Sequence, residues 1–147
     1  MRAEKDFEEL LSLLNRHKVR YCIVGSYAVA FHSRPRYTKD LDILIDPNPQ
    51  NARRILKALA DFGFRSLKLT KRDFVKAGNV IQLGYEPLRV DIITKIEGLN
   101  FNEVWRNRVV GSYGKHKVMF MGKKELIRNK QSLFRDQDKV DLKRLLK

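Results

Sequence analysis

The sequence predicts an α/β (α+β) domain in which a small mixed β-sheet is flanked by helices and the C-terminus is helical. Short apolar runs alternate with stretches whose apolar residues recur at helical spacing, a pattern typical of alternating strands and helices. Two pairs of runs are joined by turns short enough for hairpins. A chain of 147 residues, 43% of them hydrophobic, can bury one core. We therefore expect a single domain over residues 1–147, with residues 122–147 as a closing helical segment.

The first elements are predicted to be a helix, a strand and a second helix. Residues 3–17 carry apolar side chains at helical spacing behind an acidic first turn, which suits the helix dipole. Residues 20–24 form an apolar run that ends at Gly25. Ser26 is expected to cap a helix over residues 27–32.

A basic loop leads into the next strand. Pro35 disfavours helical geometry in Arg34, and the apolar run that follows the loop predicts a strand over residues 41–45. An apolar stripe then predicts a helix over residues 52–62, and a strand is expected over residues 64–69.

The second half of the chain is predicted to contain two hairpins and four helices. A Tyr-Glu-Pro turn joins the strands of the first hairpin, and a Gly-Lys turn joins those of the second. The hairpin strands cover residues 80–84 and 88–94, and residues 109–113 and 116–120. Helices are expected over residues 71–76, 101–108, 123–133 and 138–146.

The charge of the chain favours an anionic partner. Thirty-one Lys and Arg against 17 Asp and Glu give a net charge of +14, and residues 106–147 contribute 13 cations against four anions. Such an excess attracts nucleic acid or nucleotide, although it could also be a solvated surface that keeps the protein soluble. The lone Cys22, the polar N-terminus and the lack of a membrane-length apolar run predict a cytoplasmic protein with no membrane partner.

Three aspartates carry the predicted chemistry. Asp40 and Asp42 are two residues apart at the start of a strand, so both carboxylates point to the same face. Asp91 lies between Val90 and Ile92 on a second apolar strand. Carboxylate oxygens suit Mg²⁺, or Mn²⁺ in its place, and three of them can hold the two ions used for phosphoryl displacement.

Each aspartate also has a plainer interpretation. A pair such as Asp40 and Asp42 is common in proteins and could lie in a surface ion pair, and Asp91 could pair with Arg89 or another cation. Arg36 could bridge Asp40 or Asp42 in the metal-free protein.

A second group of residues is predicted to bind a nucleotide. Gly25 lets the backbone approach a phosphate closely, and Ser26 adds a hydroxyl beside the N-H groups of the next helix. Arg36 could contact phosphate, and the Thr38 hydroxyl could order the entry to the next strand. A turn between a strand and a helix is also an ordinary turn, so this signal alone is weak.

Taken in order, the segments Val24-Gly25-Ser26, Asp40-Leu41-Asp42-Ile43 and Val90-Asp91-Ile92 resemble the DNA polymerase β-type nucleotidyltransferase superfamily. Within it, the chain looks most like the AbiEii-type toxin branch and related uncharacterised bacterial and archaeal proteins. The segments Asn129-Lys130 and Arg135–Leu142 look like the closing motif of that branch.

The resemblance implies a nucleotidyltransferase fold and a role for each residue. Asp40 and Asp42 would bind both metal ions, Asp91 would bind the catalytic ion and help deprotonate the attacking hydroxyl, and Ser26 would hold the triphosphate. Lys130 would face the phosphates, whereas a lysine on a basic helix is ordinarily solvated. Asp138 and Asp141 are expected to be ion-paired with neighbours such as Arg128 or Arg144, since they lie three residues apart on the last helix.

These expectations describe an enzyme that moves a nucleoside monophosphate from an NTP to a hydroxyl acceptor and releases pyrophosphate. The basic C-terminal third favours RNA, such as a tRNA end, as the acceptor, with a protein or small molecule as alternatives. Two other functions stay open: a catalytically inactive binding module of the same fold, and a toxin held inactive by an antitoxin protein.

Overall fold

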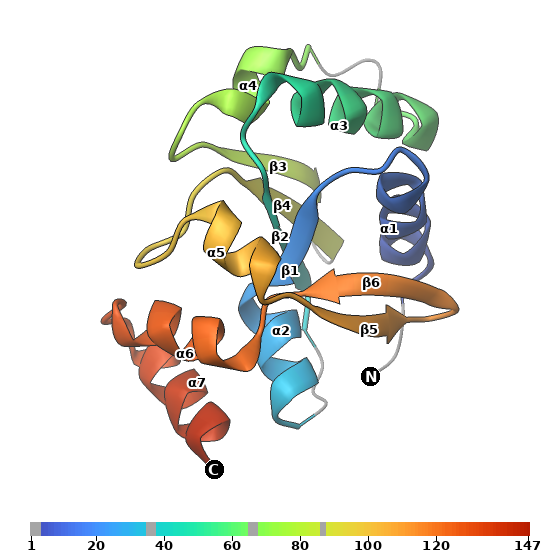
Figure 1. The fold of residues 1–147 in the computed structure, drawn as a ribbon. Helices are drawn as coiled ribbons and strands as arrows, with labels where there is room; N and C mark the ends of the chain where they lie inside the picture. The colour runs from blue at the N-terminus through green and yellow to red at the C-terminus, as the bar shows by residue number, and fades with distance from the viewer. Residues whose placement is uncertain (1–3, 35–37, 65–67, 86–87) are drawn as a thin grey trace.

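The structure is a computed structural model that describes residues 4–34, 38–64, 68–85 and 88–147. Helices and strands alternate along the chain, and the last two elements are helices (Figure 1). Their bounds are α1 Lys5–Arg16, β1 Tyr21–Val24, α2 Gly25–His32, β2 Asp40–Ile45, α3 Pro49–Phe62, α4 Lys71–Val75, β3 Val80–Tyr85, β4 Leu88–Ile93, α5 Phe101–Arg106, β5 Val109–Tyr113, β6 His116–Phe120, α6 Lys123–Gln131 and α7 Asp136–Leu146.

One mixed sheet of six strands holds the fold together, in the order β3-β4-β2-β1-β6-β5. β2 is antiparallel to β1 and parallel to β4, and β1 is parallel to β6. The two predicted hairpins form the outer pairs, β3 with β4 and β5 with β6. The predicted class, a small mixed sheet flanked by helices, is confirmed.

The core lies between the sheet and the helices α1 and α3. α1 buries every apolar residue of its predicted stripe, and α3 turns four small or aliphatic side chains inward. Leu41 and Ile43 of β2 are fully buried. Because side chains alternate along a strand, the residues between them project to the other face of the sheet.

The closing helices α6 and α7 pack against each other and against α2 (Figure 1). They therefore lie beside the helix that follows β1. Among the helices of the described residues, none combines the length and the apolar character needed to cross a bilayer.

The start of α2 differs from the prediction. The helix begins at Gly25, with Val24 in the cap position, so Ser26 is inside the helix and not its cap. The reason is the backbone of Gly25, whose φ of 64° lies in the left-handed region that glycine adopts without strain. This turn lets the helix begin directly at the end of β1.

Several other boundaries were misplaced, and one expected strand is not found within the described ranges. α3 begins at Pro49 because Asn48 caps it, accepting a hydrogen bond from the Asn51 N-H at 2.8 Å, and proline suits the first helical position. No strand is found where one was expected over residues 64–69, as far as the structure describes them, which excludes residues 65–67. The ends of α5, α6 and α7 differ from the prediction by two residues each.

Candidate functional site

The register of the central strands brings the predicted aspartates together. Asp42 on β2 lies opposite Val24 of β1 on one side and opposite Asp91 of β4 on the other. Asp40 lies opposite Arg89 in the same parallel pair. Residues in register on neighbouring strands point to the same face, so all three carboxylates share one face of the sheet with the Arg89 side chain.

Arg89 bridges two of the three carboxylates. Its Nη2 lies 3.1 Å from Asp40 Oδ2 and 3.2 Å from Asp91 Oδ2. The structure therefore has the ion pair considered for Asp91. The other bridge considered, through Arg36, lies outside the described residues.

The cluster is nevertheless short of partners. Asp40 Oδ1, Asp91 Oδ1, Thr38 Oγ1 and Arg89 Nε are buried and have no hydrogen-bond partner among the residues that the structure describes. A buried carboxylate oxygen without a donor costs free energy, and such groups in native proteins often mark a bound ion. Two unpaired carboxylate oxygens beside a third carboxylate fit a divalent cation with oxygen ligands.

The electrostatics agree with this deficit of positive charge. Burial, together with the neighbouring carboxylates of Asp91 and Asp40, raises the pKa of Asp42 from 3.8 to about 6. Burial also raises the pKa of Asp91, although Arg89 opposes the shift. A divalent cation would reverse these shifts, because it stabilises the ionised carboxylates.

The carboxylates do not yet surround one point. Within the described residues, no group of three or more His, Cys, Asp or Glu side chains is already arranged to hold a metal ion. Arg89 occupies Asp40 and Asp91 in this arrangement, so a metal would have to displace its guanidinium from them. Asp40, Asp42 and Asp91 are the residues whose chemistry fits that metal.

Gly25 is required by the site as well as by the turn. A Cβ atom at this position would clash with the carboxylate of Asp42. The first turn of α2 thus lies directly against the aspartate cluster, with the half-buried Ser26 next in sequence. Thr38 is buried at the entry to β2, and its carbonyl accepts a hydrogen bond from the Tyr27 hydroxyl at 3.2 Å.

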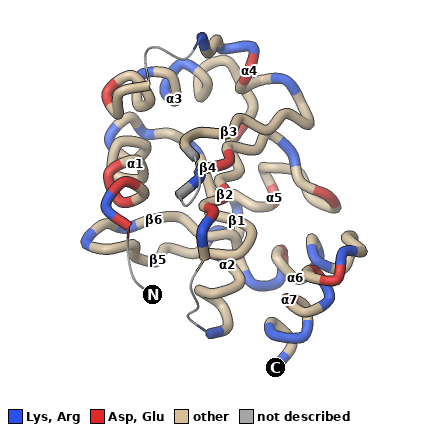
Figure 2. Tube along the Cα trace, turned by 180° about the vertical axis from the view of Figure 1, so that it is seen from behind, with Lys and Arg blue, Asp and Glu red and all other residues tan. Residues whose placement is uncertain are grey.

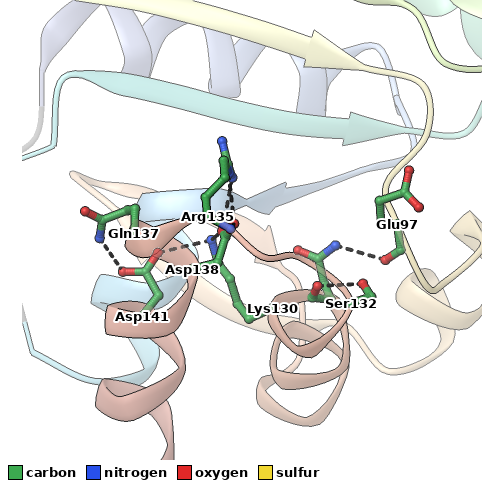
Figure 3. Close-up of polar contacts among 8 residues, drawn as sticks. Glu97, Lys130, Ser132, Arg135, Gln137, Asp138 and Asp141 are labelled. Atoms are coloured by element: carbon green, nitrogen blue, oxygen red, sulfur yellow. Dashed lines mark hydrogen bonds and ion pairs between the residues drawn. The ribbon is translucent and has the colours of Figure 1, made fainter.

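Lys130 lies in a buried ion cluster (Figure 3). Its side chain is 6% exposed, and its Nζ lies 3.1 Å from Asp138 Oδ1 and 3.1 Å from Asp141 Oδ2. The expectation of ion pairs for these aspartates was right, and they share Lys130, which was not among the suggested partners. Arg128 pairs with Glu103 instead. The turn between α6 and α7 brings Lys130 within reach of Asp138 and Asp141 on α7.

Arg135 completes this cluster and was not predicted as a site residue. Its Nε and Nη2 bind Asp138 at 2.8 and 3.0 Å, and its side chain is otherwise 74% exposed. Hydrogen bonds from Arg135 lower the pKa of Asp138 to about 2, and Lys130 contributes to the same shift. Gln137 donates to Asp141 at 2.8 Å (Figure 3).

One cavity joins the two clusters. It has a volume of about 310 Å³, and its walls include Gly25, Asp42, Lys130 and Arg135. Lysine has three N-H donors and arginine five, and the aspartates use two of each in the contacts above. Donors therefore remain on both cations, and an anion in the cavity could accept them opposite the aspartate face.

The sequence held signals for the residues that were missed. Arg89 alternates with Asp91 on one strand, so the two must share a face. Arg135 precedes Asp138 by three residues at a helix start, and the Asp138 carboxylate accepts a hydrogen bond from the Arg135 backbone N-H at 3.2 Å. Only the tertiary structure shows that either arginine reaches the site.

The chain was compared with known proteins. Residues 6–118 match the family model described as aminoglycoside-2''-adenylyltransferase. No curated protein sequence matches the chain. Among solved structures, the lincosamide antibiotic adenylyltransferase LnuA with lincomycin bound is 20% identical, with a TM-score of 0.64 over 99% of this chain and 97% of its own.

A second solved structure is a Thermotoga maritima protein with a proposed nucleotidyltransferase function. It is 15% identical, with a TM-score of 0.63 over 95% of this chain and 89% of its own. At these identities the likeness establishes the fold, so the expected nucleotidyltransferase fold is confirmed.

Proposed function

The chain belongs to the aminoglycoside-2''-adenylyltransferase family, and from this premise we propose that it transfers a nucleoside monophosphate from an NTP, with ATP as donor, to a hydroxyl group of a small molecule. Membership makes the protein a nucleotidyltransferase, so the superfamily assignment is confirmed, whereas the AbiEii branch and the antitoxin partner are not. The RNA acceptor expected from charge gives way to a small molecule, because the family and LnuA are described by small-molecule acceptors.

The observation that carries this proposal is a pair of buried oxygens on Asp40 and Asp91, beside Asp42, that have no partner in the described part of the chain. We assign these three carboxylates to two Mg²⁺ ions, which Mn²⁺ can replace. Bound there, the ions would neutralise the charge that develops on the phosphates during transfer.

The protein's own groups would orient the reactants. Gly25 and Ser26 would bind the phosphates of the NTP through the first turn of α2, and Lys130 and Arg135 would face them across the cavity. The acceptor oxygen would form a bond to the α-phosphorus while the bond to the leaving pyrophosphate breaks. Asp91 would take the proton of the acceptor hydroxyl as a general base.

A second, apolar cavity supports a small-molecule acceptor. It lies next to the cavity between the two clusters, which we call the phosphate cavity. It has a volume of about 360 Å³, shares Lys95 and Ile96 with the phosphate cavity, and is walled by Leu44 and Phe101 among others. Cavities of this size and character bind small molecules in many proteins. We assign it to the acceptor.

The test incubates the protein with α-labelled ATP, Mg²⁺ and, in separate reactions, an aminoglycoside, a lincosamide and total tRNA. Label is expected on a small molecule, and Asp42→Asn should lower the rate at least about 100-fold by analogy with the loss of other charge-stabilising groups. Asp61→Asn is the matched control, since it makes the same change on α3, where Asp61 is exposed and pairs with His17. The proposal fails if no mixture is labelled, if only tRNA is labelled, or if both variants lose activity equally.

A further inference from the structure

A basic hollow beside Trp105 takes no part in the proposed reaction. It has a volume of about 510 Å³. Five cationic side chains from four parts of the chain line it: Lys18 and Arg20 before β1, Arg54 on α3, Arg108 after α5, and Lys117 on β6. None of its lining residues is acidic, as far as the structure describes them. We call it the Trp105 hollow.

Neutral groups hold the arginines of the hollow in place. Arg108 lies over the Trp105 indole at 3.8 Å from the ring centroid and donates to the Trp105 carbonyl at 2.8 Å. Arg20 lies 5.4 Å from the same centroid, and Arg54 donates to the Lys18 carbonyl at 3.2 Å. An indole or a carbonyl fixes a guanidinium without cancelling its charge, as a carboxylate would.

The hollow therefore concentrates uncompensated positive charge. Between the described residues, the structure gives these five side chains one ion pair, from Arg20 to Asp46 at 3.8 Å. Lys18 also has a φ of 58°, a backbone conformation that a glycine would adopt more easily. Like charges gathered around one hollow repel each other, and a bound anion would relieve that repulsion.

The position of the hollow separates it from the catalytic cluster. Arg20 precedes β1, whereas Gly25 and Asp42 lie at the far end of that four-residue strand. Figure 2 shows that Lys and Arg are spread over helices and loops throughout the chain. The hollow draws cations from both halves of the sequence, and not only from residues 106–147.

We propose that the Trp105 hollow is a second, non-catalytic site that binds the phosphodiester backbone of a nucleic-acid strand. Five cations from four parts of the chain can reach several phosphates at once, which a single phosphate group cannot satisfy. Because guanidiniums already lie against the indole, the strand would be held by its backbone and not by base stacking.

The test uses the single tryptophan of the chain as a reporter. The full-length protein is titrated with a labelled 20-nucleotide single strand of mixed sequence, as RNA and as DNA, while anisotropy and Trp105 emission are recorded. Both strands are expected to bind and to change the emission saturably. With about 0.7 counterions released per phosphate and five contacts, affinity should fall on the order of 100-fold between 50 and 200 mM salt.

The decisive variant is Lys18→Gln/Arg54→Gln/Lys117→Gln. With two contacts left, the same change in salt should weaken binding only about sevenfold. Its melting temperature should not fall below that of the wild type, since repulsion has been removed, and its adenylyl transfer should be unchanged. The matched control, Lys71→Gln/Arg72→Gln/Lys76→Gln on exposed α4, removes the same charge elsewhere.

Three results would overturn the proposal. One is the absence of binding at 50 mM salt. Another is a rise in anisotropy with no change in Trp105 emission, which would place the strand elsewhere. The third is an equal loss of affinity in both triple variants, which would mean that binding of the strand depends only on the net charge of the protein. These outcomes are independent of whether adenylyl transfer is observed.

Discussion

Replacing Asp42 with asparagine should stabilise the metal-free protein while abolishing its activity. The folded protein raises the pKa of Asp42 from 3.8 to about 6. A group whose pKa is raised by folding contributes stability at low pH and loses it as the pH rises through the folded value. At 1.4 kcal/mol per pKa unit, the ionised Asp42 lowers the free energy of unfolding by about 3 kcal/mol at pH 8 and by about half of that at pH 5.

Asparagine does not ionise, so the variant should escape this penalty. In EDTA at pH 8, its free energy of unfolding should exceed that of the wild type by up to about 3 kcal/mol, which is roughly 6 to 12 °C in melting temperature for a chain of this size. The advantage should shrink by about half at pH 5. Mg²⁺ with a nonhydrolysable ATP analogue should then stabilise the wild type far more than the variant.

Urea titrations at both pH values, with Asp46→Asn as the control, measure these differences directly. The reasoning is refuted if Asp42→Asn is less stable than the wild type at pH 8 in EDTA. It is also refuted if the difference between the two proteins does not change between pH 5 and pH 8. In either case the aspartate cluster would already be neutralised in the metal-free protein.

Three other substitutions test the surroundings of the cluster. Gly25→Ala places a Cβ against Asp42 at a φ of 64°. It should lower the free energy of unfolding by about 1 to 2 kcal/mol from the backbone alone, and it should reduce kcat/KM. Full activity would show that Asp42 can move freely. Arg89→Met should tighten Mn²⁺ binding by about tenfold or more, as measured by calorimetry without nucleotide. The reason is that a competing charge at the ligand oxygens is worth a few kcal/mol. Weaker binding would show that Arg89 supports the site. Asp138→Asn should lower the free energy of unfolding by on the order of 3 kcal/mol, because it removes a buried ionic partner. Lys139→Ala, on the exposed side of the same helix, should change it by no more than about 0.5 kcal/mol. Equal effects of the two substitutions in denaturant titrations would contradict the buried cluster.

The part of the site that lies on strands could be predicted from the sequence. Asp40 and Asp42 share a face because strand side chains alternate, and Asp91 stood out as a lone charge between buried aliphatic residues. Both signals are local and depend on a period of two residues. The order of strands in the sheet, which places Asp42 between Val24 and Asp91, required the resemblance to a known superfamily.

The part that lies on the last two helices could not be predicted in the same way. Lys130 and Asp138 are eight residues apart, and only the angle of the turn between α6 and α7 decides whether they meet. A basic helix with net positive charge favours a solvated lysine, yet packing buries this one and supplies it with two carboxylates. Neither suggested neighbour, Arg128 or Arg144, is the lysine that Asp138 and Asp141 share.

The two buried charge clusters on either side of the phosphate cavity differ in how their charges are balanced. Lys130 and Arg135 are matched by Asp138 and Asp141, so that cluster is nearly neutral and holds its cations in fixed positions. Among the described residues, the three aspartates on the sheet have one arginine between them, and two of their oxygens have no partner. A neutral cluster adds rigidity without needing a ligand, whereas a cluster with excess negative charge is stabilised by binding cations. This asymmetry, and not the presence of charged residues as such, is the reason to place the metal ions on the sheet and the phosphates between the sheet and the closing helices.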